Sequence, residues 1–266
     1  MIMIKELIDI GANLTHKDYK NDLNKVIKDS QNLNINKLIV TGTNVEESLK
    51  AFALTKQYPK ILYSTAGVHP HNAKEYSDSA ESTIYELAKN SSVVAIGECG
   101  LDYYRKYSPV KDQKNAFIRQ INIACDLNLP LFMHQRDAHE DFVKIIVPCM
   151  SNIKAGVVHC FTGTEEMLDM YLKLDLYIGI TGWICDERRG VDLQRMVSKI
   201  PLDRLLIETD CPYLLPRTLK VKPKSRRNEP KFLTEIVKMI ANNTDYSLKE
   251  ISDATSENAK HIFKIL

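Results

Sequence analysis

Short apolar runs alternate along the chain with longer segments in which apolar residues recur at helical spacing. The apolar runs are rich in residues that favour strands, and they cover residues 7–14, 37–42, 61–69, 93–98, 131–134, 156–160, 176–182 and 205–210. Most are continuously apolar, which is typical of strands that are buried on both faces. We therefore expect a largely parallel sheet that is covered by helices.

The segments between these runs show helical spacing, as in Ile118, Ile121, Ala124 and Cys125. Helices are predicted near residues 22–32, 45–57, 80–89, 112–127, 139–150, 165–174 and 191–200, and after the last run near 231–242, 248–254 and 257–266. Eight strand–helix units predict an α/β protein, a single-domain (β/α)8 TIM barrel over residues 1–266. An open doubly wound sheet is the alternative, but the turn after the first strand carries neither GxGxxG nor GxxxxGK[ST].

Composition adds limits to this picture. Hydrophobic residues make up 44% of the chain and charged residues 26%, and the net charge is only +2. Any contact with nucleic acid must therefore come from a local basic patch and not from bulk charge. The beginning of the chain, MIMIKELIDIG, does not have the pattern of a signal peptide, and no stretch is apolar enough for a membrane span. We expect a cytoplasmic protein.

The six cysteines do not form a CxxC pair, which disfavours structural zinc and thioredoxin-like sites. They are read as small buried residues in a reducing compartment. Cys99, Cys160 and Cys211 each follow a candidate ligand directly. Because neighbouring side chains in a strand point to opposite faces, these three are expected to face the helix layer.

Four polar side chains stand at, or just past, the ends of predicted strands: Glu98, His134, His159 and Asp210. In a parallel barrel the carboxyl ends of the strands meet at one mouth. Two imidazoles and two carboxylates form a mixed N/O set that suits Mn²⁺, Mg²⁺ or Zn²⁺. The sequence thus predicts a divalent-metal site that activates a water molecule.

Further candidates surround this mouth. His69, in GVHPH, is placed to donate a hydrogen bond to a phosphate oxygen or a leaving group. Arginines, among them Arg136, mostly follow strands, and the segment 211–230 after the last strand is rich in proline and basic residues. This segment is expected to be irregular and to recruit a polyanion. The aromatic residues Tyr103, Tyr104, Phe161, Trp183 and Tyr213 are placed to stack unpaired bases or to pack in loops.

Eight motifs in chain order carry a resemblance to a known family: DIGANLT, GVHPH, IGECGLDY, MHQRDAHEDF, HCFTGT, YIGITGWICDERRG, LIETDCPYLLPR and SRRNEP. The chain resembles the TatD family of metal-dependent deoxyribonucleases, and its TatD branch, from the first strand to the final helices. The resemblance implies a TIM barrel, a divalent-metal centre and exonuclease action on DNA, and on RNA as an open alternative. It places metal ligands at Glu98, His134, His159 and Asp210.

The chain departs from the wider family on the first strand, where an HxH pair is replaced by Gly11 and Asn13. The TatD branch shares this change, so it does not by itself indicate lost activity. An oxygen-rich site without these imidazoles favours Mg²⁺, with Mn²⁺ or Zn²⁺ as alternatives, in one or two ions. Asn13 is expected to hold the metal ligands in place without binding the metal itself.

The hypothesis from the sequence is that the protein hydrolyses phosphodiester bonds as a 3′-to-5′ exonuclease on single-stranded DNA. It is expected to be a monomer and to act in DNA repair. Glu98 and Asp210 are the catalytic candidates. The residues expected to position the phosphate are His69, Arg136, Arg226, Arg227 and Asn228, and Asp102 is expected to hold Arg136 in place. Two alternatives stay open: a metal-dependent hydrolase of a small ester, an amide or an aminoacyl-RNA ester, and a binding protein whose site decayed at Gly11 and Asn13.

Overall fold

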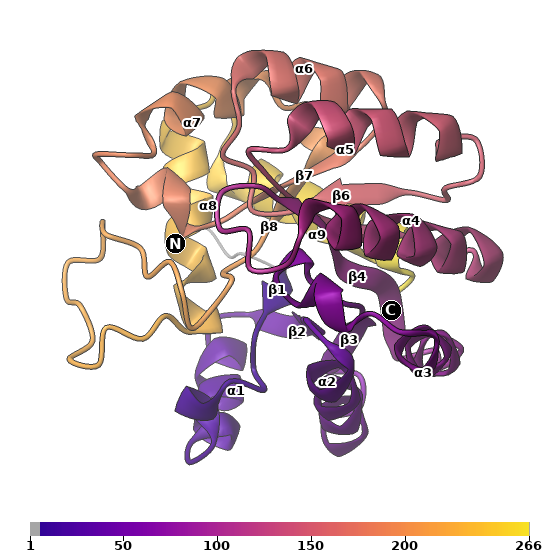
Figure 1. Ribbon diagram of the computed structural model, residues 1–266. Coiled ribbons are helices and arrows are strands. Elements are labelled where there is room, and N and C mark those ends of the chain that lie inside the picture. Colours follow the sequence, from indigo (N-terminus) through magenta and orange to yellow (C-terminus); the bar gives the residue numbers. More distant parts are fainter. Residues whose placement is uncertain (1–5, 266) are drawn as a thin grey trace.

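Eight parallel strands form one sheet in the computed structural model, which describes residues 6–265 (Figure 1). The strands are β1 (Leu7–Ala12), β2 (Ile35–Val40), β3 (Leu62–Ala66), β4 (Val93–Asp102), β5 (Leu131–Arg136), β6 (Gly156–Val158), β7 (Tyr177–Ile180) and β8 (Leu205–Ile207). Each strand pairs with the next one along the chain. This order and the alternating helices confirm the predicted TIM barrel and exclude the doubly wound alternative, in which the strand order would reverse.

Side-chain and loop contacts join β1 to β8 and bring the barrel close to closure. One bridge links Ala12 to Cys211, and the Asp210 N–H donates to the Gly11 carbonyl at 2.8 Å. The buried Asp9 carboxylate accepts from the Thr209 N–H at 2.9 Å and from the Thr209 hydroxyl at 2.5 Å. The Asp9 side chain therefore replaces part of the backbone hydrogen bonding that would otherwise join β1 to β8. This contact lies next to the segment that carries Asp210.

Helices cover the outside of the sheet (Figure 1). They are α1 (Leu23–Gln31), α2 (Val45–Gln57), α3 (Asp78–Ala88), α4 (Val110–Leu127), α5 (His139–Ile146), α6 (Glu165–Lys173), α7 (Val191–Met196), α8 (Leu233–Asn242) and α9 (Leu248–Phe263). Short 3-10 turns lie between them: η1 (Lys17–Tyr19), η2 (Pro70–Glu75), η3 (Val147–Cys149), η4 (Gly182–Cys185), η5 (Val197–Lys199), η6 (Leu202–Arg204) and η7 (Pro230–Phe232).

The two last helices predicted from the sequence, 248–254 and 257–266, are one helix, α9, within the described residues. The polar residues between them do not interrupt it. The Thr255 hydroxyl donates to the Ile251 carbonyl four residues earlier, and the Ser256 hydroxyl donates to the Glu6 carbonyl at 2.9 Å. Both hydroxyls therefore have acceptors within the protein, and the helix continues through them.

Two apolar clusters make up most of the core. One joins side chains from seven strands, such as Ile39, Phe132 and Leu206, with the end of α9 around Phe263, and fills the barrel. The larger cluster packs the outer faces of the strands against the helices and contains Cys99 and Cys211. These two cysteines therefore face the helix layer as predicted. All six cysteines are free.

The segment between β8 and α8 has no regular helix or strand from Pro212 to Glu229, as its prolines and charges predicted.

No helix of the described part of the chain is long and apolar enough to cross a membrane. The prediction that the chain does not begin with a signal peptide rests in part on residues 1–5, which lie outside the described residues.

Candidate active site

The predicted ligands meet at the carboxyl ends of the strands, in a cavity of about 1560 Å³. Glu98 lies within β4 and His134 within β5, whereas His159 and Asp210 follow β6 and β8. All four line the cavity, together with His69. The sequence placed each of them at a strand end, and the barrel brings these ends to one mouth.

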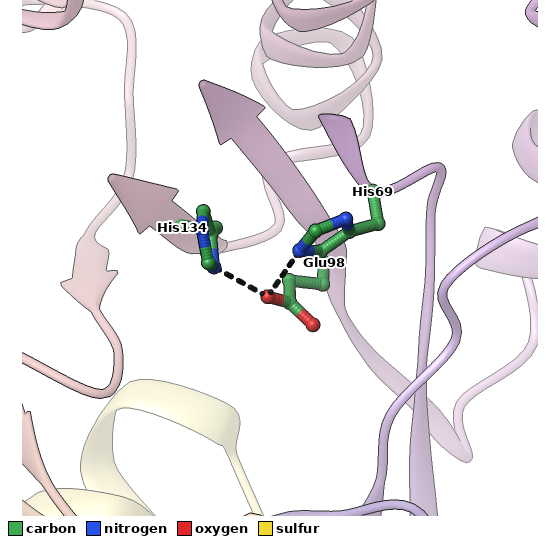
Figure 2. A group of neighbouring side chains, drawn as sticks. All are labelled: His69, Glu98 and His134. Atoms are coloured by element: carbon green, nitrogen blue, oxygen red, sulfur yellow. Dashed lines mark hydrogen bonds and ion pairs between the residues drawn. The ribbon is translucent and has the colours of Figure 1, made fainter. Parts of the chain in front are cut away.

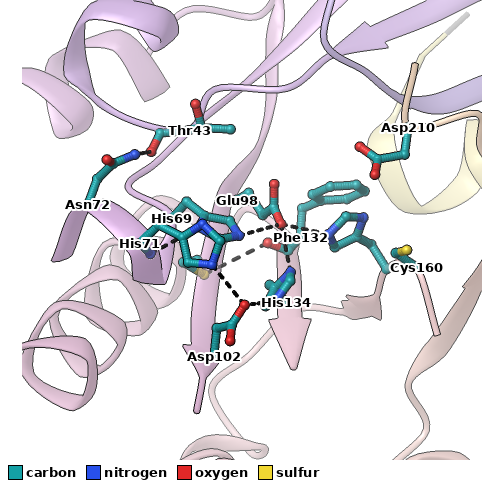
Figure 3. Close-up of polar contacts among 12 residues, drawn as sticks. Thr43, His69, His71, Asn72, Glu98, Asp102, Phe132, His134, Cys160 and Asp210 are labelled. Atoms are coloured by element: carbon teal, nitrogen blue, oxygen red, sulfur yellow. Dashed lines mark hydrogen bonds and ion pairs between the residues drawn. The ribbon is translucent and has the colours of Figure 1, made fainter. Parts of the chain in front are cut away.

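Glu98 is the centre of the cluster. Its Oε1 lies 3.2 Å from His69 Nε2, 3.0 Å from His134 Nδ1 and 2.7 Å from His159 Nε2. Figure 2 shows the first two imidazoles directed at the same carboxylate oxygen, and Figure 3 places Glu98 between His69 and Asp210. Burial would raise the pKa of Glu98, but the charges and hydrogen bonds of the imidazoles hold it well below its ordinary value. Glu98 is therefore an anion that faces ring nitrogens of three histidines, one within β5 and two that follow β3 and β6.

His69 has a fixed tautomer. Its Nδ1 accepts the backbone N–H of His71 at 3.0 Å, so in the neutral ring the proton is on Nε2, which faces Glu98. Burial lowers the pKa of His69 to about 4, against the opposing effect of Glu98. At neutral pH His69 is thus a neutral imidazole that donates a hydrogen bond from Nε2. This is compatible with the role predicted from the sequence, a hydrogen bond to a phosphate oxygen or a leaving group.

His134 lies between two carboxylates. Its Nδ1 faces Glu98, and its Nε2 is 3.4 Å from Asp102 Oδ2. Burial would lower the pKa of His134, but the neighbouring carboxylates of Asp102 and Glu98 raise it. Asp102, which also pairs with His71 at 2.8 Å, is therefore an outer partner of a candidate ligand.

The predicted partner of Asp102 was Arg136, and this pairing is wrong. Asp102 Oδ2 is engaged by the two imidazoles, and Oδ1 accepts the Arg105 N–H at 2.7 Å. The Arg136 guanidinium instead lies 3.9 Å from the ring centroid of Tyr104.

Glu208 is a residue of the site that was not predicted from the sequence. Its Oε2 lies 3.2 Å from His159 Nδ1, and its Oε1 accepts the Cys160 N–H at 2.6 Å. Burial would lower the pKa of His159, but the charges of Glu98 and Glu208 hold it well above its ordinary value. The signal was present in the sequence, since the predicted strand run 205–210 holds a second carboxylate two residues before Asp210, although β8 itself ends at Ile207 and both residues follow it.

The Glu208 carboxylate also explains the glycine on the first strand. A Cβ at Gly11 would lie 2.3 Å from Glu208 Oε2, and one at Gly179 would lie 2.6 Å from Glu208 Oε1. The carboxylate fills the volume that a side chain at position 11 would need. The missing first-strand imidazole and the buried Glu208 are therefore two parts of one arrangement.

Asp210 completes the cluster on the side of β8. The Asn13 amide donates to Asp210 Oδ1 at 2.9 Å and to the Cys211 carbonyl at 3.1 Å. Asn13 thus orients the carboxylate through its nitrogen. Desolvation raises the pKa of Asp210 to about 7, opposed by His159 and reinforced by the charges of Glu98 and Glu208.

The charge balance of this cluster suits a cation. Glu98 and Glu208 are buried and Asp210 lines the cavity, and within residues 6–265 none of the three has a Lys or Arg partner within 4.0 Å. Donor atoms of His69, Glu98 and His134 lie within 4.8 Å of one another. Clustered carboxylates without a basic residue are costly, whereas imidazole and carboxylate together match the ligand preferences of divalent metals. The residues fit a metal centre.

One cysteine departs from the expectation. Cys160 lines the cavity and does not face the helix layer. Strand β6 ends at Val158, and Cys160 has a φ of 49°, so the alternation of a strand no longer applies there. Its sulfur lies 3.6 Å from the Thr181 hydroxyl, and burial and the nearby carboxylates hold its pKa well above the ordinary value.

The predicted phosphate-binding residues fall into two groups. His69 and Arg136 line the cavity, whereas Arg226, Arg227 and Asn228 do not. Arg227 pairs with Asp22 at 2.7 Å and with Glu229 at 2.8 Å, and its guanidinium lies over the Tyr19 ring. Asn228 is buried, and its amide donates to the Thr209 and Tyr213 carbonyls. Arg227 and Asn228 thus fasten the segment after β8.

Comparison with known proteins agrees with this geometry. The family model described as TatD related DNase matches residues 8–264. A 3′-5′ ssDNA/RNA exonuclease TatD from Yersinia pseudotuberculosis is 47% identical over 260 residues, which cover 98% of this chain and 100% of the relative. A TatD family hydrolase from Entamoeba histolytica superposes with a TM-score of 0.90 at 28% identity, over 99% of this chain and 100% of the other. The TatD homologue YJJV from Escherichia coli has a TM-score of 0.91 at 24% identity, over 99% and 100%, and supports the fold.

Proposed function

This chain belongs to the family of TatD-related DNases, and on that premise we propose that it is a divalent-metal-dependent exonuclease that hydrolyses single-stranded DNA and RNA from the 3′ end. The observation that carries the proposal is the near-full-length match at 47% identity to a relative named for this activity. The cluster around Glu98 supports the same reading, because its donors suit a divalent ion at the mouth of an open cavity.

Glu98, His134, His159 and Asp210 would hold the metal, with Mg²⁺ as the proposed ion because hard oxygen ligands are prominent in the set. A bound divalent ion neutralises charge on phosphoryl oxygens and lowers the pKa of water. His134 and His159 are each oriented by an outer carboxylate, Asp102 and Glu208. These two acids keep the rings directed toward Glu98.

The chain's own groups account for the remaining needs of the reaction. Asp210, oriented by Asn13, is the proposed acceptor of the proton from the attacking water. His69 would donate its Nε2–H to a phosphate oxygen, and its pKa of about 4 keeps it in the donor form at neutral pH. Arg136, which has no carboxylate partner within 4.0 Å among the described residues, is proposed to bind a neighbouring phosphate.

The complete cluster comes from one chain, so we propose that the protein acts as a monomer. Six free cysteines are compatible with a reducing compartment, and we keep the cytoplasm as the proposed location.

The test is an end-labelling assay. The protein is stripped of metal, reloaded with Mg²⁺, Mn²⁺ or Zn²⁺, and given single strands of DNA or RNA that are labelled at the 3′ or the 5′ end. Stepwise shortening of 5′-labelled strands, with early loss of label from 3′-labelled ones, is expected with Mg²⁺. Internal cuts, or no hydrolysis with any of the ions, would overturn the proposal.

A further inference from the structure

A second cavity of about 660 Å³ opens beside the first, lined by segments that follow β5, β6 and β7. The two cavities share Gln135, Arg136, Thr162, Trp183 and Arg189, so they adjoin each other. In the other direction the first cavity reaches Lys17, Lys20 and the α2 residue Leu54. The Glu98 cluster therefore lies between two arms of one long depression.

Within residues 6–265, the arginines without a carboxylate partner gather along this depression. Six of the ten arginines form ion pairs with carboxylates: Arg119, Arg188, Arg195, Arg204, Arg217 and Arg227. Of the other four, Arg105, Arg136 and Arg189 line the cavities, and only Arg226 does not. A guanidinium without a carboxylate is available for a phosphate, so these three positions favour an anionic ligand.

Aromatic rings lie next to these arginines. Trp183 borders both cavities and stands at their junction. Tyr104, 57% exposed, lines the second cavity and carries the Arg136 guanidinium on its ring at 3.9 Å. A basic groove with exposed rings is the arrangement by which proteins bind unpaired nucleotides without reading their sequence.

The acids of the second cavity do not cancel this charge. Asp192 pairs with Arg195 at 3.6 Å, and Glu165 pairs with Lys199. Asp137 remains, against the two guanidinium groups of Arg136 and Arg189. The second cavity therefore presents two arginines without a carboxylate partner against one acid without a basic partner among the described residues.

We propose that the second cavity holds the unpaired strand next to the scissile phosphate, with a base stacked on Trp183 and backbone phosphates contacted by Arg136 and Arg189. This inference rests on the proposed nuclease function and adds the path of the strand to it. The arm at Lys17 and Lys20 is then left for the nucleotide on the other side of the cleaved bond.

Trp183 is the only tryptophan of the chain, so its fluorescence reports on this position alone. The wild-type protein in EDTA is titrated with an oligothymidylate of about ten nucleotides, a length within the range that single-strand-binding folds cover. Binding is measured independently from the anisotropy of a dye on the strand. Saturable quenching of tryptophan emission, with the same midpoint as the anisotropy change, is expected. Binding without any change in tryptophan emission would overturn the inference.

Two adjacent arginines provide a matched pair of variants. Arg189 lines both cavities and has no carboxylate partner among the described residues, whereas Arg188 pairs with Asp186 at 3.4 Å and lines neither cavity. Arg189→Ala is expected to reduce the slope of log affinity against log salt by about 0.7, the value for one lost phosphate contact on a single strand. Arg188→Ala is expected to keep the wild-type slope. Equal slopes in the two variants would contradict the assignment.

Failure of this inference differs from failure of the proposed function. If the wild-type protein shortens strands from the 3′ end but neither the fluorescence nor the Arg189→Ala slope changes, the strand path is wrong and the exonuclease proposal stands. If no divalent ion supports hydrolysis and no strand binds, both proposals fall.

Discussion

The Glu208 carboxylate lies 3.2 Å from Nδ1 of His159, on the side of the ring opposite Glu98. His134 stands in the same way between Glu98 and Asp102. In both cases an outer carboxylate faces one ring nitrogen and the other nitrogen is directed at Glu98, as a hydrogen bond for Glu208 and at ion-pair distance for Asp102. Such partners fix the tautomer and raise the basicity of a ligating imidazole.

Glu208→Gln is expected to weaken divalent-metal binding by roughly 10- to 100-fold, the usual effect of changing an outer partner of a ligating histidine. The amide keeps the size of the side chain but removes its charge. Isothermal titration of metal-stripped protein with Mn²⁺ measures the effect without reference to activity. Glu187→Gln, at an exposed glutamate that pairs with Arg217, is the control. Equal affinities in wild type and Glu208→Gln would show that Glu208 serves packing alone.

Glu98→Ala and Asp210→Asn are each expected to lower the rate on single-stranded DNA by more than about 100-fold, because loss of a ligand should exceed the effect of losing its outer partner. Both variants should stay folded, since each removes a negative charge from a group of carboxylates that has histidine partners but no Lys or Arg within 4.0 Å among the described residues. Initial rates with Mg²⁺ and circular dichroism test the two statements. A variant with a wild-type-like rate would remove that residue from the catalytic set.

Gly11 and Glu208 are expected to be coupled. Gly11→Ala introduces a methyl group at 2.3 Å from Glu208 Oε2, and it should cost about 1–3 kcal/mol of stability, as overpacking usually does. In a Glu208→Ala background the same change should cost less, because the clashing carboxylate is gone. Urea unfolding of the two single variants and the double variant gives the interaction free energy. Strict additivity would mean that the barrel relaxes around position 11 without help from Glu208.

The barrel and the Glu98 cluster were predictable because they depend on one regularity. Continuous apolar runs mark buried parallel strands, and the carboxyl ends of such strands converge. The predicted run 205–210 also contained Glu208, two residues before Asp210, but the role of Glu208 depends on which ring nitrogen of His159 it contacts. The position of the proton on an imidazole ring depends on such contacts in the folded protein, so it could not be predicted from the sequence.

Other features followed from local geometry that the sequence pattern does not contain. Cys160 enters the cavity because β6 ends two residues earlier and the backbone turns to a positive φ. Asp102 contacts His71 and His134 because β4 continues to that residue, four residues past the predicted strand end. Arg227 follows strand β8 like a substrate-binding residue, yet Asp22 and Glu229 pair with it.

Asp9 is expected to make stability depend on pH. Burial raises its pKa from 3.8 to about 7, against the hydrogen bonds from Thr209 and Gly11. Between these two values the folded protein binds more protons than the unfolded chain, so stability falls as the pH rises from about 4 to about 7. A shift of this size corresponds to roughly 4 kcal/mol at most.

Asp9→Asn isolates this effect. An amide can accept the two backbone N–H groups through its oxygen and donate to the Thr209 hydroxyl, so the seam between β1 and β8 is kept. Urea unfolding of metal-stripped protein at several pH values should give a smaller decrease for the variant than for wild type. Parallel curves would show that Asp9 stays ionised in the folded state.

Arg226 and Arg227 are adjacent but should respond differently to substitution. Arg227 forms ion pairs with Asp22 and Glu229, its guanidinium lies over Tyr19, and its own side chain is only 14% exposed. Removing it leaves the buried Glu229 with one basic partner fewer, so Arg227→Ala should destabilise the protein by about 3 kcal/mol. Arg226 is exposed and has no carboxylate within 4.0 Å among residues 6–265, so Arg226→Ala should leave stability within about 0.5 kcal/mol of wild type. Thermal unfolding of both variants measures this difference. A different result would contradict this assignment: Arg227→Ala as stable as wild type, with weaker binding of single-stranded DNA and a smaller slope of log affinity against log salt. Arg227 would then belong to the phosphate-binding surface, as predicted from its place in the sequence after the last strand.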